Sequence, residues 1–258
     1  FYPDVDDTCM VVMALARCLP SIAEWDADFL LDDWSPHEND RDASAVIAAR
    51  DEDSHLTAGH VESMRPMLGA IHRGARWILA MQSSDGGWGA FDRDNNRELF
   101  TQVPFADHNA MIDPSSADLT SRMLEMFADL NVPMTHPAVK RAIPYLWAEQ
   151  DNDFCWYGRW GVNYIYGTWQ TLVGLTRIGV PLTDARIRKA ANWLKYVQQD
   201  SGAWGESPSS YDDPSLKGQG PETASQTAWA IMGLIAAGEG DSDAVRRGVA
   251  WLIETQNE

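Results

Sequence analysis

The sequence has few cysteines, few basic residues and no long apolar run. Three scattered cysteines among 258 residues exclude a disulfide framework and indicate a reducing compartment or burial in a core. The 20 lysines and arginines are outnumbered by 38 aspartates and glutamates, which gives a net charge of -18. Nucleic acid and anionic lipid would both be repelled, so any membrane contact must be apolar. The longest apolar runs, such as residues 9–16, fall well short of the ~20 residues that cross a bilayer.

The chain is long and apolar enough to form one large domain. Hydrophobic residues make up 45% of it, which supports a sizeable core. It begins with Phe1-Tyr2-Pro3, without a methionine or a targeting signal, and it stops inside a repeat unit. We therefore expect a fragment of a longer protein.

A repeat organises the chain. In each copy a small residue follows a basic one, an aromatic residue lies four positions after the basic residue, and a glutamine lies five positions after the aromatic. The copies begin at Arg73, Arg141, Lys189 and Arg247. Six positions after the glutamine, the first three copies have Trp88, Trp156 and Trp204. We interpret these glutamines and tryptophans as staples of turns, because buried amides bond backbone groups and indoles pack on neighbouring units.

An apolar stretch precedes each copy and begins at a small polar cluster. The clusters are Asp7-Thr8, Asp118-Leu119-Thr120, Gly167-Thr168 and Gln226-Thr227. Such residues favour helix N-termini, so we expect helices to start there. The upstream stretches carry almost no charge, whereas residues 185–196 have basic residues on one face, which is typical of an outer helix. The pattern predicts an all-α double layer of inner and outer helices, either an open solenoid or a closed α/α barrel.

The first unit contains an acidic insertion at about residues 21–67. Thr8 to Gln82 spans 74 positions, whereas Thr120 to Gln150 spans 30, so the excess is 44 residues. We interpret the insertion as a solvated excursion and assign it no chemistry.

Asp4, Asp6 and Asp7 crowd three carboxylates into four positions before the most apolar stretch. Helix capping and a magnesium site are two simple interpretations. The third is chemical: carboxylates so close to an apolar wall cannot all ionise cheaply, so the pKa of one rises and it stays protonated at neutral pH. A neutral acid that faces an apolar cavity is a Brønsted acid.

Six aromatic residues occur within residues 156–169. Aromatic faces attract cations without being nucleophilic, which suits a cavity that carries carbocations. The alternative for any single ring is packing in the core.

Together these features resemble the prokaryotic squalene–hopene cyclases. Residues 4–8 match the D-x-D-D-T motif of that family, and the basic–aromatic–Gln–Gly–x–Trp units match its QW motif. Residues 158–168 and 224–230 are similar to its sequences as well. The resemblance implies that residues 1–258 are part of a catalytic α/α barrel, a toroid of six helix pairs that is incomplete here. It also implies a second barrel domain, absent from this chain, and a large apolar cavity between the two domains.

The resemblance implies a role for each acidic residue of the motif. In such enzymes the middle aspartate, here Asp6, protonates the terminal alkene of squalene, and the flanking Asp4 and Asp7 tune and support it. Asp118 matches an acid whose partner four residues on, His in some members and Arg122 here, hydrogen-bonds the catalytic aspartate. A permanent cation tends to lower the pKa of Asp6. We therefore hypothesise that Asp118 neutralises Arg122 and leaves Asp6 protonated.

The resemblance also implies contacts with the substrate. Phe91, Trp160 and Tyr166 match positions that line the cavity of the family, and Phe91 stands where some members have a tyrosine. Phe105 and Ala106 match a constriction of the substrate channel. No metal and no organic cofactor are implied.

The implied function is that of a bacterial class II triterpene cyclase, an isomerase of hopanoid biosynthesis. It converts squalene to hopene or hopanol through protonation and a carbocation cascade. The resemblance further implies a monotopic enzyme on the cytoplasmic side of the membrane, which it contacts through apolar surface, with no nucleic-acid partner and with a homodimer left open.

Two alternatives remain: a class II cyclase of another linear isoprenoid, and a noncatalytic α/α scaffold that binds apolar ligands. A metal-dependent prenyl transferase is disfavoured, because Cys9, Cys18 and Cys155 lack Cys–His spacing for zinc.

Overall fold

The computed structural model describes residues 4–19, 58–96 and 112–256, and all regular structure in these ranges is helical. The α-helices are α1 (Val5–Cys18), α4 (Ala58–Ala80), α5 (Ala117–Asp129), α6 (Pro137–Ala148), α7 (Tyr164–Arg177), α8 (Ala185–Tyr196), α9 (Ala224–Ala236) and α10 (Asp243–Glu254). Two short 3-10 helices, η4 (Pro208–Tyr211) and η5 (Pro214–Leu216), lie between α8 and α9. The all-α prediction is confirmed. None of the described helices combines the length and the hydropathy needed to cross a bilayer.

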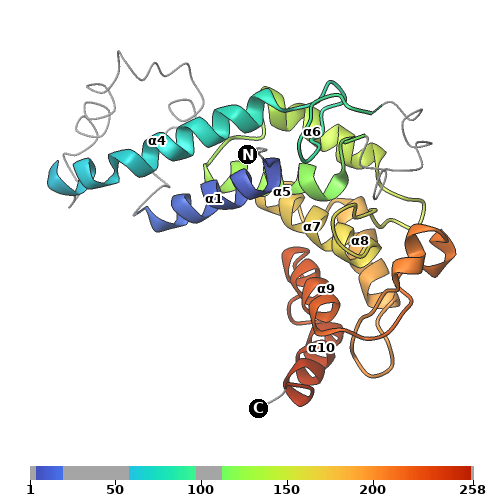
Figure 1. Cartoon of the computed structure of the whole chain (residues 1–258). Coiled ribbons are helices and arrows are strands. Elements are labelled where there is room, and N and C mark those ends of the chain that lie inside the picture. The colour runs from blue at the N-terminus through green and yellow to red at the C-terminus, as the bar shows by residue number, and fades with distance from the viewer. Residues whose placement is uncertain (1–3, 20–57, 97–111, 257–258) are drawn as a thin grey trace.

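The helices form two layers. In the inner layer α5 packs against α1 and α7, and α7 packs against α9. The outer helices α4, α6, α8 and α10 pack on α1, α5, α7 and α9 respectively. Figure 1 shows these pairs following one another in chain order, from α1 and α4 to α9 and α10. The expected alternation of inner and outer helices in an incomplete α/α barrel is confirmed.

The inner helices start earlier than their polar clusters suggested. Asp4, and not Asp7-Thr8, caps α1: its side chain accepts the backbone N–H groups of Asp6 (2.7 Å) and Asp7 (3.0 Å). In the next three inner helices the expected cap threonine lies inside the first turns and accepts a tryptophan backbone N–H. These contacts are Trp88 to Thr120 (3.1 Å), Trp156 to Thr168 (3.0 Å) and Trp204 to Thr227 (3.0 Å). The threonines therefore join each Gln–Trp turn to the following inner helix.

The Gln–Trp turns share one set of bonds. Each buried indole N–H donates to the carbonyl ten residues earlier, at 2.7 Å in all three copies. Each glutamine amide donates to the carbonyl four residues on. Gln82 and Gln198 also donate to Ala138 and Ala244, near the start of the next outer helix, at 2.9 and 2.8 Å. The glutamines and tryptophans of these turns thus hold successive repeats together, as expected of staples.

One turn position needs a left-handed backbone in every complete copy. Gly86 and Gly202 occupy it with φ of 97° and 98°, and a Cβ on Gly86 would lie 2.6 Å from the carbonyl oxygen of Arg141. Phe154 takes this place in the second copy with φ of 67°, a conformation that L side chains rarely adopt. Its ring lies under the ammonium of Lys189, 4.1 Å from the ring centroid.

The first outer helix is longer than the others. Most of the expected insertion lies outside the described residues. Its last part, residues 58–67, is helical and belongs to α4, which has 23 residues against 12 in α6, α8 and α10.

We predict that Trp156→Ala destabilises the protein strongly. The indole is fully buried and bonds the carbonyl of Leu146, so its removal leaves a cavity and an unpaired acceptor. Core changes of this size cost about 3–5 kcal/mol. Thermal unfolding of the whole protein measures the effect, with Tyr196→Ala as control because that ring is exposed. Equal unfolding midpoints in the two variants would contradict the prediction.

Candidate active site

Asp6 and Arg122 form an ion pair near the N-terminal ends of α1 and α5. The Nε of Arg122 lies 2.6 Å from Oδ1 of Asp6, without the alignment of a hydrogen bond. The Asp6 side chain keeps 33% of its surface exposed, against 13% for Arg122. Asp4 is engaged in capping the same helix, and Asp7 is exposed. Of the three clustered carboxylates, Asp6 is therefore the one aimed at the inner layer.

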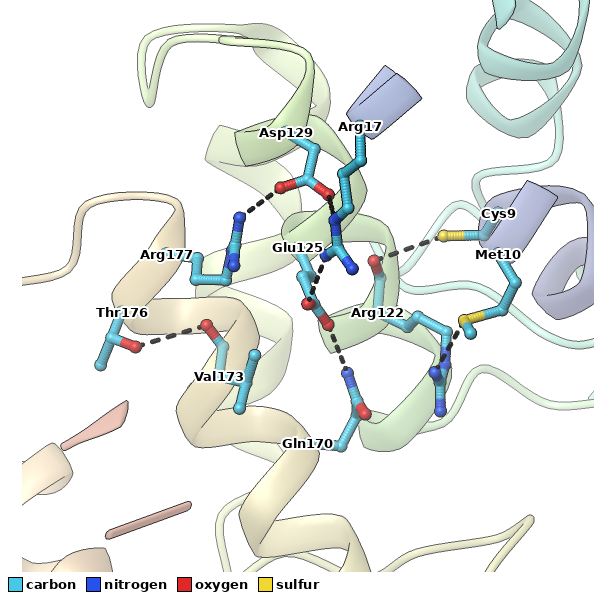
Figure 2. Close-up of polar contacts among 10 residues, drawn as sticks. All are labelled: Cys9, Met10, Arg17, Arg122, Glu125, Asp129, Gln170, Val173, Thr176 and Arg177. Carbon is cyan, nitrogen blue, oxygen red and sulfur yellow. Dashed lines mark hydrogen bonds and ion pairs between the residues drawn. The ribbon is translucent and has the colours of Figure 1, made fainter. Parts of the chain in front are cut away.

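Arg122 joins three inner helices. Its Nη1 lies 3.1 Å from the sulfur of Met10 on α1, and its Nη2 donates to the hydroxyl of Tyr166 on α7 at 3.3 Å. Its backbone carbonyl accepts the thiol of Cys9 at 3.4 Å, as Figure 2 shows. The guanidinium thus links the Tyr166 hydroxyl to the Asp6 carboxyl.

The inner face of α5 carries two further polar side chains, at later turns than Arg122. Glu125 accepts from Arg17 of α1 and from Gln170 of α7, both at 3.3 Å. Asp129 accepts from Arg17 at 2.9 Å and also pairs with Arg177 of α7. Figure 2 shows these contacts bridging the three inner helices. They fix the register of α1, α5 and α7, and the sequence analysis did not predict them.

The structure corrects the hypothesis that Asp118 neutralises Arg122. Arg122 forms its ion pair with Asp6. The Asp118 carboxylate, 1% exposed, instead accepts the Ser116 hydroxyl and the backbone N–H groups of Leu119 (3.0 Å) and Trp160 (2.8 Å). These three donors satisfy the Asp118 carboxylate, so Asp118 acts on Asp6 and Arg122 only through its electrostatic field.

The electrostatic environment favours a protonated Asp6. Burial raises the pKa of Asp6, the Arg122 guanidinium opposes that rise, and the carboxylates of Asp4, Asp118 and Asp7 add to it. The net direction is upward. Burial also raises the pKa of Asp118, against the hydrogen bonds that it accepts.

Tyr166 is held between glycines and tryptophans. A Cβ on Gly158 or Gly161 would lie 2.7 or 2.6 Å from atoms of the Tyr166 ring, so both positions exclude a side chain. The ring meets those of Trp169 and Trp229 edge-on, with centroids 5.6 and 5.0 Å away. Trp229 was not predicted as a site residue, although it lies in the stretch 224–230 that carried part of the resemblance.

Phe91 and Trp160 form a second aromatic contact. Their rings meet edge-on with centroids 5.9 Å apart, and the Trp160 ring is 48% exposed. Asp113 holds the loop of Phe91 by accepting the backbone N–H groups of residues 90–92 at 3.1, 2.6 and 2.8 Å. Ala90 in turn accepts the N–H of Val5 at 2.8 Å, which joins this loop to the start of α1. Asp113 had no signal in the sequence, because one aspartate in a loop is common.

Most of the predicted site residues therefore lie in one connected group. Arg122 is in direct contact with both Asp6 and Tyr166, and Asp118, Trp160 and Phe91 are joined to them through α5 and the 90–92 loop. Phe105 and Ala106 lie outside the described residues. Within the described ranges, no cluster of three or more His, Cys, Asp or Glu side chains is placed to hold a metal ion.

Comparison with solved structures shows the fold. The type II terpene cyclase MstE from Scytonema, in complex with geranylgeranyl dihydroxybenzoate, matches 97% of this chain and 68% of its own with a TM-score of 0.52. The sequence identity is 18%, so this likeness concerns the fold alone.

Sequence comparison shows the family. The squalene–hopene cyclases of Zymomonas mobilis and Bradyrhizobium diazoefficiens are 39% and 41% identical to the whole chain, which spans 33% of the length of each. The family model of the squalene-hopene cyclase C-terminal domain matches residues 23–258. By the family model and these relatives, this chain belongs to the squalene–hopene cyclase C-terminal domain family.

Proposed function

We propose that this chain is the catalytic barrel of a squalene–hopene cyclase in which Asp6 is the Brønsted acid. The observation that carries the proposal is the Asp6 carboxyl itself. It is partly buried at the inner layer, its pKa is raised, and it contacts Arg122, which holds Tyr166 beside it. The chain covers about a third of its relatives, so the activity is that of the whole protein.

Arg122 makes the two carboxyl oxygens of Asp6 unequal, because its Nε contacts Oδ1. Because Oδ1 faces the guanidinium, the transferable proton resides on Oδ2. Proton transfer from Oδ2 to the terminal alkene leaves a tertiary carbocation on the substrate and a carboxylate on Asp6. The π electrons of each following alkene then close the next ring. Loss of a proton or addition of water ends the cascade as hopene or hopanol.

Arg122 also stabilises the charge that forms. When Asp6 gives up its proton to the alkene, the Arg122 guanidinium already in contact with it stabilises the carboxylate that remains in this partly buried site. The nearby carboxylates of Asp4, Asp7 and Asp118 oppose ionisation in the resting state. They therefore favour the protonated form of Asp6, and the developing carboxylate is held by an interaction already in place.

The aromatic residues suit the substrate side of this reaction. The faces of Phe91, Trp160 and Tyr166 stabilise carbocations without reacting with them. Phe91 provides a π face without a hydroxyl, so it offers no lone pair that could intercept a cation. We assign Phe105 and Ala106 to the constriction of the substrate channel, on the resemblance alone.

We extend the proposal to the membrane. Squalene is a hydrocarbon of the bilayer, and a net charge of -18 repels anionic lipid, so attachment must be apolar. We propose a monotopic enzyme on the cytoplasmic side, and the resemblance to the family supports this. The same proposal allows a homodimer.

We predict that the full-length protein converts squalene to hopene or hopanol and that Asp6→Asn abolishes turnover. The amide fills the same space but cannot give up a proton to an alkene. Gas chromatography with mass spectrometry identifies the products from squalene and from shorter polyenes, and circular dichroism checks the fold. Asp212→Asn, an exposed acid on another segment, is the control and keeps its activity.

Two outcomes of this assay would contradict the proposal. Full turnover by Asp6→Asn would assign the activity to another group or leave a noncatalytic scaffold. Turnover of a shorter polyene with none of squalene would favour a cyclase of another isoprenoid.

We further predict that the alkaline limb of the pH profile of kcat/KM follows the pKa of Asp6. Activity needs the protonated acid, so it falls as pH rises through that pKa. Asp118→Asn removes a charge that raises the pKa of Asp6, so the limb moves to lower pH. Arg122→Gln removes the cation that lowers this pKa, so the limb moves to higher pH.

The pH profiles of the two variants are measured beside that of Asp212→Asn, whose limb stays in place. Shifts of the same sign in Asp118→Asn and Arg122→Gln would contradict the electrostatic assignment.

A further inference from the structure

Glu206 is a buried carboxylate that the proposed chemistry does not use. It lies two residues after Trp204 in the turn that follows α8, and it is 3% exposed. Its Oε2 accepts the backbone N–H groups of Asn163 at 3.3 Å and of Ile165 at 2.9 Å. Its Oε1 is buried and has no hydrogen-bond partner within the described ranges. Both hydrogen bonds of the Glu206 carboxylate are therefore made to backbone N–H groups at the start of α7.

The start of α7 needs such a group. Its cap residue, Asn163, makes no side-chain capping bond, and its first turn contains no acidic residue. The first N–H groups of a helix have no partner inside the helix, and its positive end favours an anion. Glu206 supplies both the acceptor and the charge from a segment 41 positions further along the chain.

Glu206 is itself held in place by α9. Its backbone N–H donates to the Gln226 side-chain oxygen at 2.8 Å, and its carbonyl accepts the Gln226 amide at 3.1 Å. The Gln226 amide also lies 3.1 Å from the carbonyl of Val162, in the turn before α7. Gln226 of α9 thus fixes the backbone of Glu206, so the carboxylate is presented to α7 from a fixed position. A side chain held in this way can position its neighbour precisely.

The segment after Glu206 also bonds the turn that precedes α7. The Tyr211 hydroxyl lies 3.1 Å from the carbonyl of Gly158 and 2.9 Å from that of Gly161. Ser210 accepts the Asn163 side-chain amide at 3.2 Å. Gly158 and Gly161 are the residues that pack on the Tyr166 ring. Residues 206–211 therefore set both the start of α7 and the surroundings of Tyr166.

We propose that Glu206 is a positioning residue for the catalytic acid. It fixes the first turn of α7, which places the Tyr166 hydroxyl, and this hydroxyl accepts the Nη2 of Arg122, whose Nε faces Asp6. The inference rests on the proposed function, because it assigns Glu206 an effect on Asp6. No contact between Glu206 and substrate is invoked.

The test uses the full-length enzyme with squalene. Glu206→Met keeps the length of the side chain and removes both acceptors, so we expect kcat to fall about 10- to 100-fold, as for a misplaced catalytic group. Glu206→Gln keeps an acceptor oxygen and loses the charge, so its kcat falls less, by about threefold to tenfold. In both variants the alkaline limb moves to higher pH, because a looser Arg122 lowers the pKa of Asp6 less.

A double-mutant cycle separates positioning from stability. In a Tyr166→Phe background the hydroxyl is absent, so the losses caused by the Glu206 variants shrink to below about threefold, which is the non-additivity expected of coupled residues. Trp204→Phe is the matched structural control: it removes the indole bond to Leu194 in the same turn and leaves intact the hydrogen bonds that Glu206 accepts from the start of α7. Even where Trp204→Phe lowers the melting temperature as much as a Glu206 variant does, we expect it to leave the alkaline limb of the pH profile in place.

Each outcome bears on one claim. Wild-type kcat in both Glu206 variants, multiplicative losses with Tyr166→Phe, or a limb that moves equally in Trp204→Phe overturns the inference while the proposed function stands. If Glu206→Met does not fold, the cycle with Glu206→Gln decides. A wild-type enzyme that does not cyclise squalene contradicts the proposed function instead.

Discussion

The ion pair between Asp6 and Arg122 is the interaction on which the candidate site depends. It joins the first turn of α1 to the second turn of α5, and through Tyr166 it reaches α7. A cation so close to a carboxyl normally favours ionisation. Burial and three neighbouring carboxylates outweigh it here, so the pKa of Asp6 moves upward. The candidate site therefore combines a carboxyl of raised pKa with a cation in contact with it, which is the balance that the proposed protonation of an alkene requires.

That balance depends on a rigid inner layer. Three Gln–Trp turns with nearly equal bond lengths join the helix pairs, and the threonines of α5, α7 and α9 lock each turn to the helix that follows. Glu125 and Asp129 hold α1, α5 and α7 in register further along the barrel. Because Asp6 lies on α1 and Arg122 on α5, a shift of either of these two helices would change the distance between the two side chains.

The polar residues around the site divide into those that act on charge and those that act on position. Asp4, Asp7 and Asp118 influence the pKa of Asp6 through their fields. Asp113 and Glu206 instead accept backbone N–H groups, of the Phe91 loop and of the first turn of α7. Carboxylates that accept backbone donors fix a loop or a helix end without entering the reaction. The acidic composition of the chain thus partly reflects structural anchoring of its aromatic residues.

The sequence by itself determined the repeat, the all-α class and the inner and outer helices, because each of these is a local pattern of spacing or residue type. The proposal that Asp6 is the acid came from the resemblance to the family. Only the tertiary structure decided that Asp4 caps α1, that Arg122 pairs with Asp6 and not with Asp118, and that residues 58–67 belong to α4. It alone brought Glu206 to α7 and Trp229 to Tyr166. Such partners lie about 40 to 115 positions apart, and no spacing along one chain encodes which distant side chain will satisfy a given charge or helix end.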